Sequence, residues 1–267
     1  IQDEQRLGAQ EHPKVIREVG GVYDDPSVTS YVAIVASKLT AASELPNIDW
    51  HFTVLNSEEI NAFALPGGYV YVTRGLMALA DNEAELAGVL AHEIGHVTAR
   101  HSTERQSKAT IAGLGAAAAG LLLGGPAGDI ANQVGSGYIQ HYSQDQEFQA
   151  DTLGVRYLSR TGYQTSTMAD FLSKLRDHAR LQNKILGRPE NAADEADFFA
   201  SHPRTIDRVQ QATAEAGRVA GSGTILNRDI YLDKIAGMTF GDDTDQGFVR
   251  ARQFIHPKLM FRFEAPD

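Results

Sequence analysis

The first hundred residues contain segments with helical and with strand-like spacing of apolar side chains. Residues 26–43 repeat apolar positions every three or four residues, which predicts a helix. Residues 48–54 alternate apolar and polar side chains and predict a strand, and a second strand is expected at residues 69–73. A long helix rich in Ala and Leu is predicted from Asn82, a residue type that caps helix N-termini, to about residue 105.

The second half of the chain is predicted to be mainly helical. Its expected elements are helices at residues 142–160, 165–184 and 203–216, a polar and acidic loop at 186–200, a Gly-rich linker at 217–223, a short helix and turn at 229–240 and a strand at 259–263. The pattern as a whole indicates an α+β protein, mainly helical, with few strands.

Composition and charge exclude several kinds of partner and of site. Hydrophobic residues make up 42% of the chain and charged residues 22%, as in ordinary globular proteins. A net charge of −10 argues against a nucleic-acid partner, because few basic side chains remain to neutralise phosphates. The chain has no cysteine, which excludes disulfides and cysteine-ligated zinc.

One apolar run, residues 109–128, approaches the length of a membrane span. It consists mostly of Ala and Gly, which drive membrane insertion weakly, and Pro126 interrupts its end. We therefore expect a flexible or helical hairpin, or a loop that brings the protein close to a membrane, in preference to a transmembrane helix.

The residues that carry chemistry lie on the helix predicted from Asn82. His92 and His96 are four residues apart, so both imidazoles lie on one helix face and can bind one metal ion. Glu93 can act as general base toward a zinc-bound water, which is the arrangement of the H-E-x-x-H motif. Zinc lowers the pKa of such a water and polarises a peptide carbonyl. The alternative is a pair of surface histidines on an amphipathic helix.

A catalytic zinc ion needs a third protein ligand. The metzincin pattern would require Gly at position 99 and His at position 102, but the chain has Ala99 and Ser102. His101 would lie about 140° around a continuous helix from the ligand face. We therefore expect His101 to be either a surface histidine or one that contacts a metal ligand without binding the metal itself.

A glutamate on the next predicted helix is the other candidate for the third ligand. Glu147 has Asp151 one turn away on the same helix face. Asp151 could then accept a hydrogen bond from a ligand imidazole, as carboxylates commonly do at zinc sites. The alternative is an exposed acidic helix face.

Four motifs occur in a set order, at residues 61–68 (NAFALPGG), 92–101 (HEIGHVTARH), 147–151 (EFQAD) and 201–208 (SHPRTIDR). Together they resemble the gluzincin zinc metallopeptidase family of HtpX, the CAAX prenyl protease and BepA. The resemblance covers residues 1–216 and implies a gluzincin-type zincin domain, with a small mixed β-sheet packed on the active-site helix. Residues 217–267 do not resemble the helical repeats that follow the BepA peptidase domain. We expect them to be a linker and the truncated start of a C-terminal appendage.

The resemblance implies roles for these residues. One Zn²⁺ ion per chain would be bound by His92, His96 and Glu147. His202 would lie near the metal, where it stabilises the oxyanion or occupies the open coordination position, and Arg208 would be an electrostatic partner. From the residues alone, His202 is a helix cap and Arg208 an ordinary surface charge.

The NAFALPGG segment is predicted to be an ordered turn that leads into an edge strand, to which a substrate could add as a further strand. The resemblance accordingly implies substrate-binding residues in this segment, namely Asn61, Ala62, Phe63, Gly67 and Gly68. A plain structural turn is the alternative.

The sequence thus predicts a zinc metalloendopeptidase that hydrolyses peptide bonds of proteins. Without clear hydrophobic spans it is placed nearer the soluble, exported BepA-like members. That implies misfolded envelope proteins as substrates, and a location in the periplasm or on the periplasmic side of a membrane. One alternative is a latent zinc-bearing chaperone or scaffold whose site is occluded by His202. Another is an interaction protein without a metal.

Overall fold

The computed structural model describes residues 1–105, 142–185, 187, 202, 206–219, 223–244, 247–250 and 252–264. The apolar run at 109–128 lies outside the described residues, and so does the predicted acidic loop at 186–200 apart from residue 187. Among the described residues, every helix is either too short or too polar to span a lipid bilayer.

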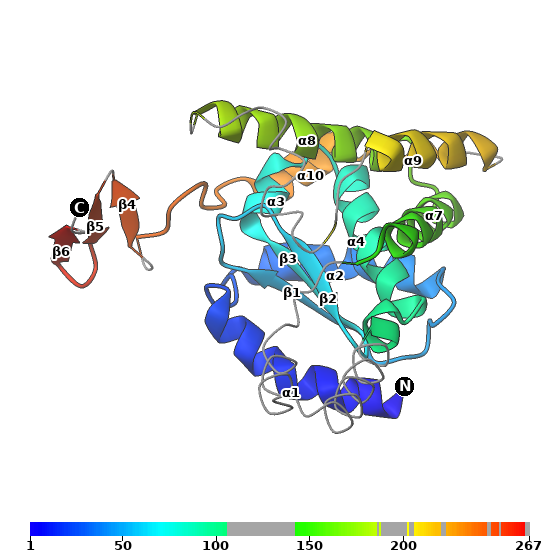
Figure 1. Ribbon diagram of the computed structural model, residues 1–267, viewed down its shortest axis with the longest axis horizontal. Helices are drawn as coiled ribbons and strands as arrows, with labels where there is room; N and C mark the ends of the chain where they lie inside the picture. Colours follow the sequence, from blue (N-terminus) through cyan, green and yellow to red (C-terminus); the bar gives the residue numbers. More distant parts are fainter. Residues whose placement is uncertain are drawn as a thin grey trace, which may run out of the picture.

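Helices and two small sheets confirm the predicted α+β class (Figure 1). The described helices are α1 (Gln2–Glu18), α2 (Pro26–Ala41), α3 (Arg74–Leu79), α4 (Glu83–Thr98), α7 (Gln144–Arg160), α8 (Thr167–Ile185), α9 (Ile206–Arg218) and α10 (Arg228–Ile235). The strands are β1 (His51–Leu55), β2 (Ala62–Leu65), β3 (Tyr69–Thr73), β4 (Phe248–Arg250), β5 (Gln253–His256) and β6 (Phe261–Glu264).

The sheet formed by β1, β2 and β3 is mixed, as predicted. Its strand order is β1-β3-β2. β1 runs parallel to β3, with His51 opposite Tyr69, and β2 runs antiparallel to β3, with Ala62 opposite Val72. β2 is therefore an edge strand of this sheet. The strand that follows the NAFALPGG segment, β3, is the central strand, so the prediction that this segment leads into an edge strand is wrong.

The prediction that residues 61–68 form a turn is wrong for the first half of the segment. Residues 62–65 form the strand β2, which pairs with β3, and Ala62 and Phe63 of this strand are buried. The turn is confined to residues 66–68, where Gly67 has a φ of +84° and Gly68 a φ of +100°. A Cβ on Gly67 would lie 2.4 Å from the Cα of Gln5, so the close approach of α1 requires a glycine there.

The N-terminal helix α1 has no counterpart among the predicted elements. It lies along the side of the sheet opposite to α4 (Figure 1). Val15 and Ile16 of this helix, and Val19 directly after it, pack against a small apolar cluster that is formed by Leu55, Phe63, Leu65 and Tyr71. The helix therefore covers an apolar face of the sheet that would otherwise be exposed.

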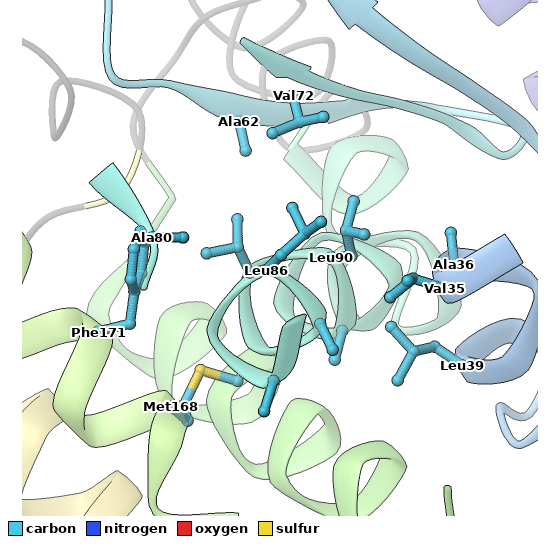
Figure 2. Close-up of a cluster of buried hydrophobic side chains, with 14 of the residues drawn as sticks. Val35, Ala36, Leu39, Ala62, Val72, Ala80, Leu86, Leu90, Met168 and Phe171 are labelled. Atoms are coloured by element: carbon cyan, nitrogen blue, oxygen red, sulfur yellow. The ribbon is translucent and has the colours of Figure 1, made fainter. Parts of the chain in front are cut away.

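The helix α4 is the centre of the core. Asn82 caps its N-terminus as predicted, by accepting a hydrogen bond from the backbone N–H of Glu85. All its residues from Glu83 to His96 are buried, because the sheet, α2, α7 and α8 all pack against it. Figure 2 shows Leu86 and Leu90 of this helix among apolar side chains from the sheet, α2 and α8.

The first part of the segment after residue 217 packs against the preceding residues. Tyr231 of α10 is fully buried, and its hydroxyl donates a hydrogen bond to the backbone carbonyl of Met77. Arg74 donates from Nη1 to the carbonyl of Thr239 at 3.0 Å. The sheet formed by β4, β5 and β6 lies apart from the rest (Figure 1). The predicted domain boundary at residue 216 stays a prediction.

Candidate metal centre

The candidate metal centre lies where α4 and α7 pack against each other. Two glycines permit the close approach of these helices. A Cβ on Gly95 would lie 3.0 Å from the carbonyl oxygen of Ala150, and one on Gly154 would lie 3.3 Å from the backbone nitrogen of His92. Larger side chains at either glycine would push the helices apart, and the functional side chains with them.

The structure brings together His92, His96, Glu147 and His202. The Nε2 atoms of His92 and His96 are 3.0 Å apart. Each lies 3.4 Å from a carboxylate oxygen of Glu147. The Nδ1 atom of His202 lies 2.9 Å from Oε1 of Glu147 and 3.3 Å from Nε2 of His92. One ligand atom from each residue lies within 4.8 Å of the others, and all four side chains are buried, so a single metal ion could contact all of them.

The predicted partners Asp151 and Arg208 adjoin this group. Oδ1 of Asp151 lies 2.8 Å from Nδ1 of His92. Arg208 donates two hydrogen bonds of 2.7 Å to the carboxylate of Asp151, from Nε and Nη2. Its Nη1 lies 2.6 Å from Oε2 of Glu147. Arg208 is 3% exposed, so the interpretation as an ordinary surface charge is wrong.

Burial and neighbouring charges have opposite effects on the pKa values of these side chains. Burial would raise the pKa of Glu147, but the positive charge of Arg208 and the contact with His202 outweigh it and hold that pKa well below its ordinary value. Burial would also raise the pKa of Asp151, and Arg208 again lowers it. Burial lowers the pKa of His96 well below its ordinary value, whereas Asp151 outweighs burial at His92 and raises its pKa to about 9. Metal binding needs carboxylates and neutral imidazoles, so His92 would release a proton on binding a metal.

Glu93 faces the same site. Its Oε1 lies 3.5 Å from Nε2 of His202, and the side chain is 2% exposed. Burial raises the pKa of Glu93 above its ordinary value. Within the described part of the chain, its Oε2 has no hydrogen-bond partner. A buried carboxylate with a raised pKa can take up a proton, as a general base must.

His101 is buried and contacts the candidate ligand His96, so the expectation of a surface histidine is wrong and the other expectation, a histidine that contacts a ligand, is confirmed. The predicted helix to residue 105 ends early, because α4 stops at Thr98 and Arg100 adopts a left-handed conformation with a φ of +59°. Residues 101–105 start a new helical turn. His101 thereby returns toward the site, is 1% exposed, and places its Nδ1 2.8 Å from Nδ1 of His96.

Tyr142 is a neighbour of the site that the sequence did not indicate. Its ring stacks on His96 with centroids 3.7 Å apart and an interplanar angle of 25°. The Arg105 guanidinium lies 3.9 Å from the centroid of the same tyrosine ring. No periodic pattern could have identified Tyr142, because it is a single aromatic residue just before α7.

The residues predicted to bind substrate fall into two groups. Ala62 and Phe63 lie in the edge strand β2, directly after Asn61, whose Oδ1 is buried without a hydrogen-bond partner among the described residues. Gly67 and Gly68 lie in the turn between β2 and β3. A Cβ on Gly68 would approach the carbonyl oxygen of Asp49 to 2.7 Å, so close packing requires a glycine there. The role of these residues in substrate binding stays a prediction.

Several known proteins are similar in sequence over most of this chain. The chain is 33% identical over 232 residues to the beta-barrel assembly-enhancing protease of Yersinia pestis. The aligned segment covers 82% of this chain and 46% of that protein. It is 31% identical over 233 residues to the protein of that name from Escherichia coli K12, with the same coverage. It is also 26% identical over 215 residues to the mitochondrial metalloendopeptidase OMA1 of Schizosaccharomyces pombe, with coverage of 78% and 59%. The chain thus spans about half the length of these relatives.

A model of peptidase family M48 matches the greater part of the chain. The matched segment is residues 26–216, which includes α4, α7 and the part of α9 that carries Arg208. It ends before α10 and before the sheet formed by β4, β5 and β6. The chain belongs to peptidase family M48.

Proposed function

We propose that the protein is a zinc-dependent endopeptidase that hydrolyses peptide bonds of proteins, with one zinc ion per chain. The observation that carries the proposal is the group of His92, His96, Glu147 and His202, whose ligand atoms lie within 4.8 Å of one another beside the buried carboxylate of Glu93. Two imidazoles and a carboxylate form a ligand set that catalytic zinc commonly has.

The chemistry of the donor atoms supports zinc at this position. Both Nε2 atoms of the H-E-x-x-H histidines face the carboxylate of Glu147, at 3.4 Å. Oε2 of Glu93 and Nε2 of His202 are buried without a hydrogen-bond partner among the described residues. Burying such atoms destabilises a fold unless a polar group or an ion contacts them. Hard oxygen-binding ions are less well suited to a set with several imidazoles.

Each side chain has a separate task in the proposed reaction. Bound zinc would supply Lewis acidity toward a peptide carbonyl and a water molecule. Glu93 accepts a proton from the attacking water and passes it to the leaving amine, which its raised pKa favours. Asp151 holds the ring of His92 through Nδ1, and Arg208 fixes the carboxylates of Asp151 and Glu147.

His202 is proposed to fill the fourth ligand position in a resting form. Its Nδ1 lies as close to Glu147 and His92 as the other ligand atoms do. A peptide carbonyl needs that position, so His202 must leave it during turnover. The similarity to named proteases favours the endopeptidase over a latent chaperone or scaffold that keeps His202 in place.

The edge strand β2 is the proposed binding strand for an extended peptide. It contacts α4, and strand addition would place a peptide backbone beside Ala62 and Phe63. Proteins of the bacterial envelope, cleaved in the periplasm, are the proposed substrates, because the bacterial relatives are named for enhancing beta-barrel assembly.

The variant Glu93→Gln tests the proposed reaction. It removes the proton acceptor but leaves His92, His96 and Glu147 in place, so zinc should still bind at one ion per chain. Cleavage of a denatured, fluorescently labelled casein should fall by about 100- to 10,000-fold, the usual contribution of a positioned base. Elemental analysis and a fluorescence time course give the two values.

Three outcomes would contradict parts of this proposal. Cleavage by Glu93→Gln at the rate of the unsubstituted chain would remove Glu93 from its role. A purified chain without zinc, and without affinity for added zinc, would refute the metal site. If the unsubstituted chain and His202→Ala both bind zinc and neither cleaves casein, the latent chaperone becomes the better explanation.

A further inference from the structure

His101 lies behind the ligand His96, on the side away from the metal position. The Nε2 atom of His96 faces Glu147 at 3.4 Å, whereas its Nδ1 faces Nδ1 of His101 at 2.8 Å. Nε2 of His101 in turn lies 3.1 Å from Oε1 of Gln149, an exposed residue of α7. A row of hydrogen-bonding atoms therefore leads from the ligand to the protein surface.

The backbone is distorted where it brings His101 to this position. Arg100 is one of only a few non-glycine residues with a positive φ among the described residues, and an L-residue in that conformation costs about 1 kcal/mol. Arg100 donates a hydrogen bond of 2.9 Å to Glu4 of α1, and Thr103 contacts the same carboxylate. Strained backbone that is held in place by its surroundings is common at functional sites.

The atoms allow one assignment of protons once a metal occupies the site. A metal ion takes the Nε2 lone pair of His96, so the neutral ring carries its proton on Nδ1. That N–H must donate to Nδ1 of His101, which can accept only if its own proton is on Nε2. The Nε2–H of His101 then donates to the amide oxygen of Gln149.

We propose that His101 is a positioning residue that accepts the Nδ1–H hydrogen bond of His96 and so holds the Nε2 lone pair of His96 toward the metal. This inference rests on the proposed metal site. The two ligand histidines are then supported differently: His92 by the carboxylate of Asp151, and His96 by a neutral imidazole.

Charge explains why a neutral acceptor suits His96. Glu93, Glu147 and Asp151 are buried in the site, where they face the buried Arg208 and would face a divalent ion. With all three ionised, their negative charges are balanced. A fourth carboxylate at position 101 would leave an uncompensated buried charge, which is strongly destabilising. An imidazole provides the acceptor atom without a charge.

The ring of Tyr142 restricts movement of the His96 ring out of its own plane. The hydrogen bond to His101 fixes His96 within its plane, and the stacked Tyr142 ring covers one face. The two contacts together leave the imidazole little freedom to turn away from the metal position.

Two variants of the 267-residue chain separate hydrogen bonding from packing. His101→Asn places an amide oxygen close to the position of the imidazole Nδ1 and keeps the acceptor. His101→Phe keeps a planar ring and removes the acceptor. The dissociation constant for zinc is measured by competition with a chromophoric chelator. Leu39→Ala, a core truncation in α2, controls for a general loss of stability.

The expected order of zinc affinity follows from the hydrogen bond. Loss of the acceptor in His101→Phe should weaken zinc binding about 10- to 100-fold, while His101→Asn stays within about threefold of the unsubstituted chain. Leu39→Ala should lower the unfolding temperature and leave zinc affinity unchanged. Equal affinity of all the proteins overturns the proposal. Equal weakening by Asn and Phe also overturns it, because packing would then explain the loss.

A measurement on the unsubstituted chain keeps the test independent of whether the variants fold. In the zinc-loaded, ¹⁵N-histidine-labelled protein, NMR should detect an Nδ1–H proton on His96 and a through-hydrogen-bond coupling to Nδ1 of His101. A proton on Nδ1 of His101 refutes the assignment. If the unsubstituted chain binds no zinc, the proposed function fails, and this inference fails with it.

Discussion

The first residue of α4, Glu83, is the acceptor for three separate segments, and its replacement should destabilise the whole domain. Its side chain is 3% exposed. It accepts hydrogen bonds of 2.6 Å from the hydroxyls of Tyr31 in α2 and Tyr163 before α8, and one of 2.9 Å from the amide of Asn227 before α10. These contacts fix the start of the helix that carries the H-E-x-x-H motif.

The size of the effect follows from which donors lose their acceptor. In Glu83→Ala the hydroxyls of Tyr31 and Tyr163 are left buried without a partner, at about 1–3 kcal/mol each, whereas water can reach the partly exposed Asn227. We expect a loss of about 3–5 kcal/mol in the free energy of unfolding once the lost packing is included. Glu83→Gln keeps one oxygen acceptor and should lose about 1–2 kcal/mol.

The pH dependence of this difference has a defined sign. Burial would raise the pKa of Glu83, but the hydrogen bonds from Tyr163, Tyr31 and Asn227 outweigh it and lower that pKa. A carboxyl with a lowered pKa in the folded state stabilises the fold above its unfolded pKa of about 4.3, and this contribution is lost as the pH falls through the lower folded value. The stability difference between the unsubstituted chain and Glu83→Gln should therefore shrink as the pH falls below 4.

Urea unfolding followed by circular dichroism, with chelator present in all samples, measures these differences at each pH. Tyr31→Phe is the matched control, since it removes one donor and leaves the carboxylate with two others. A difference that stays constant between pH 7 and pH 3 would show that the charge of Glu83 contributes nothing. Glu83→Ala within about 0.5 kcal/mol of the unsubstituted chain, the range of ordinary surface substitutions, would refute the reasoning altogether.

Three further predictions concern the metal centre. Gly95→Ala should be less stable than Gly88→Ala by about 1 kcal/mol or more in thermal unfolding, because its Cβ would lie 3.0 Å from Ala150 whereas at Gly88 the nearest atom is 3.7 Å away. Asp151→Asn removes a charge that meets both His92 and Arg208, so zinc affinity should fall about 10- to 100-fold in chelator competition. Chelation of the metal should abolish casein cleavage and lower the unfolding temperature, and added zinc should restore both, because the ion binds only the folded chain.

Local patterns were sufficient to predict much of the fold. The helix α2 lies within the predicted range of 26–43, and β3 has the predicted ends at residues 69 and 73. Asn82 caps α4 by accepting from the backbone of Glu85. These features depend on neighbours in sequence, which is why periodicity and capping residues identify them.

The errors arose where distant contacts override local preference. Arg100 is not a residue type that usually ends a helix, so the run from Asn82 reads as helical to residue 105, and the contact with Glu4 of α1 is invisible in the sequence. The Pro-Gly-Gly signal in NAFALPGG likewise hides the short strand β2, which exists because β3 pairs with it. Tyr142 could be linked to His96 only through the fold, and so could the pair of atoms through which His101 contacts that ring.

The contacts of Glu83 also bear on where the functional unit ends. The match to peptidase family M48 stops at residue 216, yet Asn227 donates to Glu83 and Tyr231 fills a buried position against Met77. Both contacts come from a segment that follows the Gly-rich stretch, and both act on α3 or on the first turn of α4. The histidines of the proposed metal site lie further along that same buried helix. The segment around α10 therefore supports the helix that holds the proposed catalytic groups.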